Sequence, residues 1–106
     1  MKIGTDNKLA HLQLEYNELY EQTCTLGAVA NTTLNMVRYY ETYLSSNGGD
    51  RSAIAEYRKA ITKYRSVVSQ INRNNYRLQS LIRRINEETI RLQAKQMGYA
   101  NRRRMY

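Results

Sequence analysis

The sequence predicts an all-α protein, an antiparallel two-helix coiled-coil hairpin completed by oligomerisation or by a partner. Apolar residues recur at alternating steps of three and four in both halves, no proline interrupts either half, and a short glycine-containing segment separates them. With 106 residues we expect a single domain. It comprises helix 6–46, loop 47–50, helix 51–97 and a basic tail, 98–106.

The first predicted helix carries one stripe of apolar and small residues. The stripe consists of Leu9, Leu12, Tyr16, Leu19, Thr23, Leu26, Ala30, Thr33, Val37, Tyr40 and Leu44. Residues at this spacing share one side of an α-helix, so we expect them to pack against the second helix. In the segment that follows, Gly48 and Gly49 are expected to end the helix in the left-handed conformation, and Asp50 to cap the next helix.

The same pattern resumes in the second half, where Gly98 is expected to end the helix. This stripe consists of Ile54, Tyr57, Ile61, Tyr64, Val68, Ile71, Asn75, Leu78, Ile82, Ile85, Thr89 and Leu92. A short loop makes the helices antiparallel, which pairs Leu44 with Ile54 and Thr23 with Asn75. The alternative is one continuous helix that dimerises. Two adjacent glycines would cost such a helix about 2 kcal/mol, which favours the hairpin.

The loop-proximal half contains more apolar residues than a two-stranded seam needs. The surplus consists of Val29, Leu34, Met36 and Tyr43 in the first helix and Ala53, Ala60 and Val67 in the second. Exposed apolar patches usually mark contacts with other proteins, although such residues also flank many seams without a role. Because a lone hairpin buries little area, we predict a protein interface, with self or a partner, at Val29, Leu34, Met36, Tyr43 and Val67.

Charge divides unevenly along the chain. The net charge is +8, made up of −3 over residues 1–50 and +11 over residues 51–106. The predicted contacts for a polyanion or an acidic partner are Lys59, Lys63, Arg73, Arg77, Arg83, Arg84, Arg91, Arg102, Arg103 and Arg104. A cationic row of this kind fits a phosphate backbone or an acidic protein surface. The alternative is an ordinary solvated helix face.

No catalytic, cofactor or metal site is predicted. Cys24 and His11 are the only residues of their types, which gives no set of metal ligands. Gly48 and Gly49 lack the following Lys-Ser or Lys-Thr of a phosphate-binding loop. The sequence shows no signal peptide or spanning segment. We therefore expect a protein that is not an enzyme, that does not bind membranes, and that resides in the cytoplasm or in a particle assembled there.

In outline the chain is similar to the small Trp-x-Gly helical hairpins exported by type VII secretion. It has Asn47-Gly48-Gly49 at the turn and no tryptophan, so no residue role is carried over. The sequence predicts a structural or assembly protein, a hairpin component of a larger complex such as a phage-like particle or secretion machinery. The alternative is a nucleic-acid-binding module that uses the second helix and the C-terminal tail.

Overall fold

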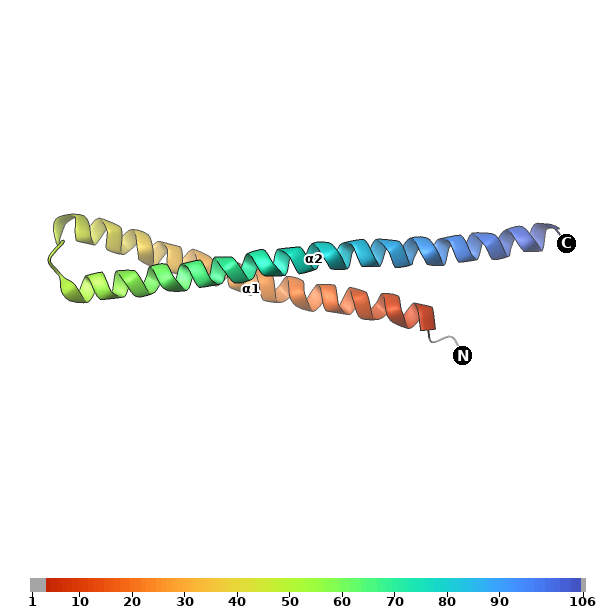
Figure 1. Ribbon diagram of the computed structural model, residues 1–106, viewed down its shortest axis with the longest axis horizontal. Coiled ribbons are helices and arrows are strands. Elements are labelled where there is room, and N and C mark those ends of the chain that lie inside the picture. The colour runs from red at the N-terminus through yellow and green to blue at the C-terminus, as the bar shows by residue number, and fades with distance from the viewer. Residues whose placement is uncertain (1–3, 106) are drawn as a thin grey trace. The chain divides into compact units, whose positions relative to one another are not determined.

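The computed structural model contains two long helices, α1 (Gly4–Ser46) and α2 (Arg51–Met105), joined by residues 47–50 (Figure 1). It describes the backbone of residues 4–105 and the side chains of residues 7–98. The predicted all-α hairpin is confirmed. The expected helix end at Gly98 is wrong, because α2 continues to Met105. A single glycine costs a helix only about 1 kcal/mol, too little to end it.

The chain forms two compact units, and both helices contribute to each. The loop unit comprises residues 21–75, and the terminal unit comprises residues 1–20 together with 76–106. In the loop unit, α1 and α2 are antiparallel neighbours on either side of the connecting turn.

A tight turn connects the helices. The Asn47 backbone N–H donates to the Tyr43 carbonyl oxygen at 3.0 Å, and the Asp50 N–H donates to the Asn47 carbonyl oxygen at 3.1 Å. In the described backbone no glycine has a positive φ, so the predicted left-handed helix end at Gly48 and Gly49 is wrong. A hydrogen bond across four residues with negative φ at both central positions is the pattern of a type I turn.

Asp50 caps α2, as the sequence predicted. Its Oδ1 accepts the Ala53 backbone N–H at 3.1 Å, and its Oδ2 accepts the Tyr43 hydroxyl at 2.7 Å. Both bonds favour the carboxylate, and the pKa of Asp50 is lowered, chiefly by the bond from Ala53 and then by that from Tyr43. One side chain therefore satisfies the first turn of α2 and ties it to the last turns of α1.

The predicted stripe of α1 is confirmed, since each of its eleven residues is buried or half-buried. In the predicted stripe of α2 every residue is buried or half-buried except Asn75 and Ile82, which are exposed. At every second position of this stripe, the preceding residue is the more buried of the two. The side chains that lie in the seam there are Ala53, Ala60, Val67, Asn74, Leu81 and Glu88.

These more buried residues of α2 bear on which residues face each other. If the antiparallel register is counted from the turn, Ala53 falls opposite Leu44 and Ala60 opposite Val37, which sets a small side chain against a large one. Asn75, predicted to lie opposite Thr23, is exposed, and half-buried Asn74 takes that position. The seam position expected for Asn75 is therefore wrong.

The core of the terminal unit is a small apolar cluster. Leu12 and Leu19 of α1 lie with Leu78 and Leu81 of α2, and Tyr16 and Ile85 pack against them. Leu81 is 4% exposed, whereas its neighbour Ile82 is 44% exposed. The difference in exposure between these two adjacent residues shows which of them lies in the seam and thus defines the register of α2.

Alanine substitutions at this pair test the register. We expect Leu81→Ala to lower the free energy of unfolding by about 2–4 kcal/mol, because it leaves a cavity in a packed cluster. Ile82→Ala, at an exposed helical position, should cost less than about 1 kcal/mol. Urea unfolding followed by circular dichroism measures both. A larger loss for Ile82→Ala would restore the register predicted from the sequence.

Candidate interaction surfaces

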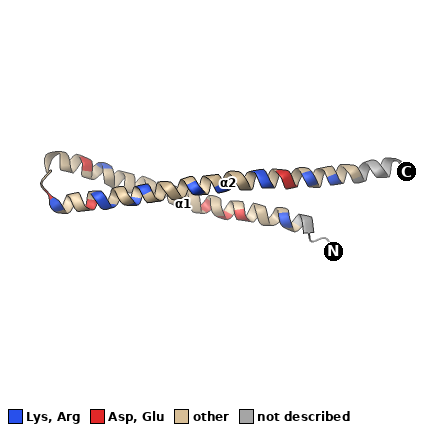
Figure 2. Ribbon diagram, in the orientation of Figure 1, with Lys and Arg blue, Asp and Glu red and all other residues tan. Residues whose placement is uncertain are grey.

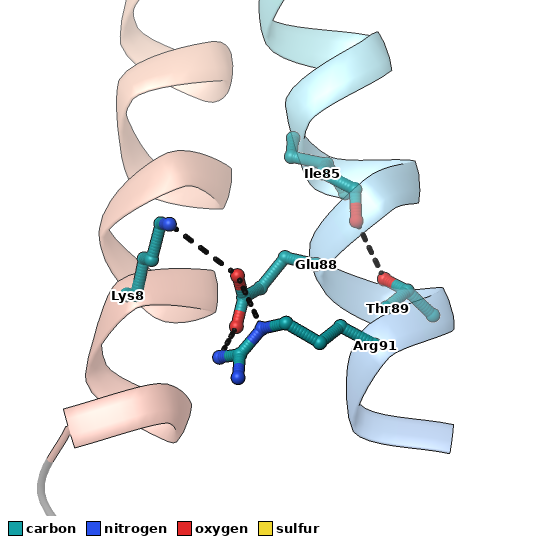
Figure 3. A network of polar contacts seen from close by, with 5 residues as sticks. All are labelled: Lys8, Ile85, Glu88, Thr89 and Arg91. Atoms are coloured by element: carbon teal, nitrogen blue, oxygen red, sulfur yellow. Dashed lines mark hydrogen bonds and ion pairs between the residues drawn. The ribbon is translucent and has the colours of Figure 1, made fainter. Parts of the chain in front are cut away.

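The terminal unit contains a buried carboxylate, Glu88, which is 4% exposed (Figure 3). Glu88 extends from α2 toward α1, where Lys8 Nζ lies 3.5 Å from its Oε2. Arg91 Nε donates to the same oxygen at 3.4 Å, and Arg91 Nη2 pairs with Oε1. Lys8 of α1 and Glu88 of α2 thus form an ion pair between the two helices. Two cations compensate one carboxylate in the seam.

The surroundings of Glu88 stabilise its charged form. Hydrogen bonding from Arg91 is the largest effect, and the charges of Arg91 and Lys8 act in the same direction, so the pKa of Glu88 is lowered despite its burial. A general base at neutral pH needs a raised pKa and a concave site. Glu88 has a lowered pKa, and its oxygens are engaged within the hairpin. Its role in this arrangement is to hold α1 and α2 together.

Glu88 should make the stability of the hairpin depend on pH. Because its pKa is lower in the folded than in the unfolded chain, its contribution is present above the ordinary value of 4.5 and is lost as the pH falls through the folded pKa. We expect Glu88→Gln to lower the thermal midpoint at pH 7, and the difference from the unmodified chain to be smaller at pH 3.

The control for this measurement is Glu87→Gln. Glu87 is an exposed carboxylate on the same turn, and its Oε1 lies 4.0 Å from Arg83 Nε. Glu87→Gln should change the thermal midpoint little at either pH, because exposed ion pairs contribute about 0–1 kcal/mol to stability. A deficit of Glu88→Gln that persists undiminished at pH 3 would show that the shape of the side chain matters and its charge does not.

Tyrosine rings gather on α1 near the turn. The ring centroids of Tyr39 and Tyr40 are 5.2 Å apart, and those of Tyr39 and Tyr43 are 6.4 Å apart with nearly parallel planes. Tyr39 is 63% exposed. The rings border a groove of about 270 Å³ lined by Tyr39, Tyr40, Tyr43, Asp50, Ser52, Ala53 and Glu56.

The five residues predicted to form a protein interface do not share one surface. Val29, Met36 and Tyr43 recur every seven residues, each one position before a seam residue of α1, and Met36 is 42% exposed. Leu34 is half-buried and follows a seam residue, which places it on the other side of the hairpin. Val67 is 5% exposed and belongs to the seam itself, so its expected surface position is wrong.

The predicted basic residues are spread along α2 (Figure 2). Those with described side chains are Lys59, Lys63, Arg73, Arg77, Arg83, Arg84 and Arg91, and all are exposed. Three of them pair with acids on their own helix: Lys59 with Glu56 at 3.3 Å, Arg83 with Glu87, and Arg91 with Glu88. Arg102, Arg103 and Arg104 lie outside the described side chains.

A basic groove runs along α2 in the loop unit. Its volume is about 600 Å³, and its lining consists of Arg58, Lys59, Thr62, Lys63, Ser66, Val67 and Gln70. Three cationic side chains surround hydroxyl and amide donors, and no carboxylate is part of the lining. Such a surface suits an anion, because every polar group on it can donate a hydrogen bond.

Two rows on α2 were missed from the sequence. Ile54, Ile61 and Val68 are half-buried, one position outside the seam, and we call them the aliphatic row. Arg51, Arg58 and Arg65 are exposed at the same seven-residue spacing, and we call them the arginine row. The spacing of the arginines was visible in the sequence. The exposure of the aliphatic row was not, because those residues were expected to lie in the seam.

Within the described residues, no cluster of three or more His, Cys, Asp or Glu side chains is suited to a metal ion, and Cys24 is an exposed thiol. Over the same residues neither helix has a stretch long and apolar enough to cross a membrane. No protein-family model, curated protein or solved structure is significantly similar to this chain.

Proposed function

We propose that this chain is a non-enzymatic structural or assembly protein, a helical-hairpin component that makes protein–protein contacts in a larger complex assembled in the cytoplasm. The observation that supports the proposal is the aromatic and thioether surface on α1 formed by exposed Met36 and Tyr39, with half-buried Tyr43 stacked beside Tyr39. Stacked tyrosine rings offer a large, rigid contact area, and their hydroxyls tolerate water when no partner is bound.

The thin core of the hairpin supports the same proposal. Among the described residues, no large side chain is less than 2% exposed. A pair of helices buries one strip on each, and this leaves a modest hydrophobic contribution to stability. Covering Met36 and Tyr39 with another protein surface would remove more apolar area from water.

Replacing this surface tests the proposal. We expect the chain to exceed its monomer mass of 12.5 kDa in sedimentation velocity as its concentration rises, or to elute in a stoichiometric complex from its source cells. The double variant Met36→Ser with Tyr39→Ser should weaken this association about tenfold or more, because exposed aromatic anchors dominate interface energies.

The control is Thr32→Ser with Asn35→Ser, which alters exposed polar side chains of the same helix and should leave association unchanged. Circular dichroism confirms that both variants retain their helices. A chain that remains monomeric at every concentration and elutes without a partner would refute the proposal.

Nucleic-acid binding is a second candidate, favoured by the basic groove of α2. It predicts an affinity for duplex DNA that falls steeply with salt, since phosphate contacts release counterions. Lys59→Gln with Lys63→Gln should reduce the slope of log affinity against log salt by about two. Replacing Arg102, Arg103 and Arg104 by alanine should reduce it further. Binding that is absent or insensitive to salt would exclude this candidate.

A further inference from the structure

The aliphatic row lies on a side of the loop unit that the tyrosine cluster does not occupy. Each member follows a seam residue of α2 by one position, as Leu34 and Glu41 follow seam residues of α1. In an antiparallel helix pair, positions that follow the seam lie on the same side of both helices. The 3.2 Å hydrogen bond from the Tyr57 hydroxyl to Glu41 Oε1 agrees with this placement.

Leu34 and Gly27 of α1 lie on the same side as the aliphatic row. Leu34 is half-buried, like the aliphatic row beside it. Gly27 lies seven residues before Leu34 in α1 and occupies the same side. A Cβ atom built there would meet no atom within 4 Å outside its own helix backbone. The side is therefore an apolar strip of half-buried residues that spans both helices.

Arginines border the strip on both helices. Each member of the arginine row precedes a member of the aliphatic row by three positions, so the two are neighbours on the helix surface. On α1, Arg38 lies four residues after Leu34 and is exposed. Among the described side chains, none of these four arginines forms an ion pair, and the one carboxylate on this side, Glu41, accepts the Tyr57 hydroxyl.

We propose that this side, defined by the aliphatic row, Leu34 and the bordering arginines and here called the aliphatic–arginine face, docks an acidic amphipathic helix of a partner protein. The inference rests on the proposed assembly function and specifies the partner. Seven residues of α-helix rise about 10.5 Å, so a partner helix with apolar residues at heptad spacing matches the aliphatic row along its length. Glu or Asp beside that apolar stripe would meet the arginines, which bind carboxylates through two parallel hydrogen bonds.

Charge and polarity favour an acidic amphipathic helix over a phosphate backbone and over a second copy of this chain. A phosphate backbone would meet the arginines but would leave the aliphatic row against charged oxygens, which brings no hydrophobic gain. A second copy docked face to face would bring two sets of arginines together, and like charges repel across an interface. An acidic amphipathic helix satisfies the apolar strip and its charged borders together.

The test uses the full chain and a fluorescent synthetic peptide of four heptads, with leucine at the seam positions and glutamate at the flanking ones. Fluorescence anisotropy should show that this peptide binds, while a version with lysine in place of glutamate and a scrambled version of the same composition do not. The triple variant Arg51→Gln, Arg58→Gln, Arg65→Gln should weaken binding at least tenfold.

The matched control removes the same amount of charge from elsewhere on α2. Lys59→Gln, Lys63→Gln, Arg73→Gln should change the affinity by less than about twofold, because these side chains lie outside the aliphatic–arginine face. Gly27→Gln adds a long, helix-favouring side chain over the open part of the strip. It should weaken binding at least fivefold without lowering the thermal midpoint.

Equal losses in the two triple variants would show attraction by net charge alone and would overturn the inference. So would equal binding of the lysine peptide, competition by duplex DNA that depends on the arginine row, or loss of self-association in the arginine-row variant. If association through Met36 and Tyr39 is observed but the acidic peptide does not bind, the inference fails while the proposed function stands. If the peptide binds but the chain enters no assembly, the proposed function fails alone.

Discussion

Two helices that have only each other to pack against can bury one narrow strip apiece, and this limit governs the surfaces of the hairpin. In α2 the strip passes through Ala53 and Ala60, whose small side chains are buried. Because the strip has room for one residue at each step, Ile54 and Ile61 remain at its margin, half in water. The surfaces available to partners are thus a consequence of how the seam is filled.

Each unit also holds a carboxylate that links α1 to α2. In the loop unit, Asp50 accepts hydrogen bonds from a backbone N–H in the first turn of α2 and from the hydroxyl of Tyr43 in α1. In the terminal unit, Glu88 forms ion pairs with Lys8 of α1 and with Arg91 of its own helix. Directional bonds of this kind fix which residues face each other, something that apolar contacts alone specify weakly. The lowered pKa values of both groups have the same origin, in donors that favour the charged form.

The degree to which the fold was predictable differs between the helices for a physical reason. Leu12 lies between His11 and Gln13 in the α1 sequence, so periodicity alone places it in the seam. In α2, apolar residues come in adjacent pairs such as Ala60–Ile61 and Leu81–Ile82, and either member satisfies the pattern. The choice depends on the volume left by the facing helix, which a one-dimensional pattern does not contain. Gly48 was ambiguous in another way, since glycine adopts either sign of φ at little cost.

The uncertain register of α2 also affected the prediction of the candidate surfaces. Met36 and Tyr43 were predictable because they stand outside an unambiguous stripe, whereas Val67 was misplaced with the register of α2. Once the register is corrected, the loop unit has two unlike sides, one with tyrosine rings and one with aliphatic residues bordered by arginine. Partners suited to them differ in charge and would not compete for the same side chains. If both proposals hold, one short hairpin can therefore contact two neighbours at once, which is what a connecting component of an assembly must do.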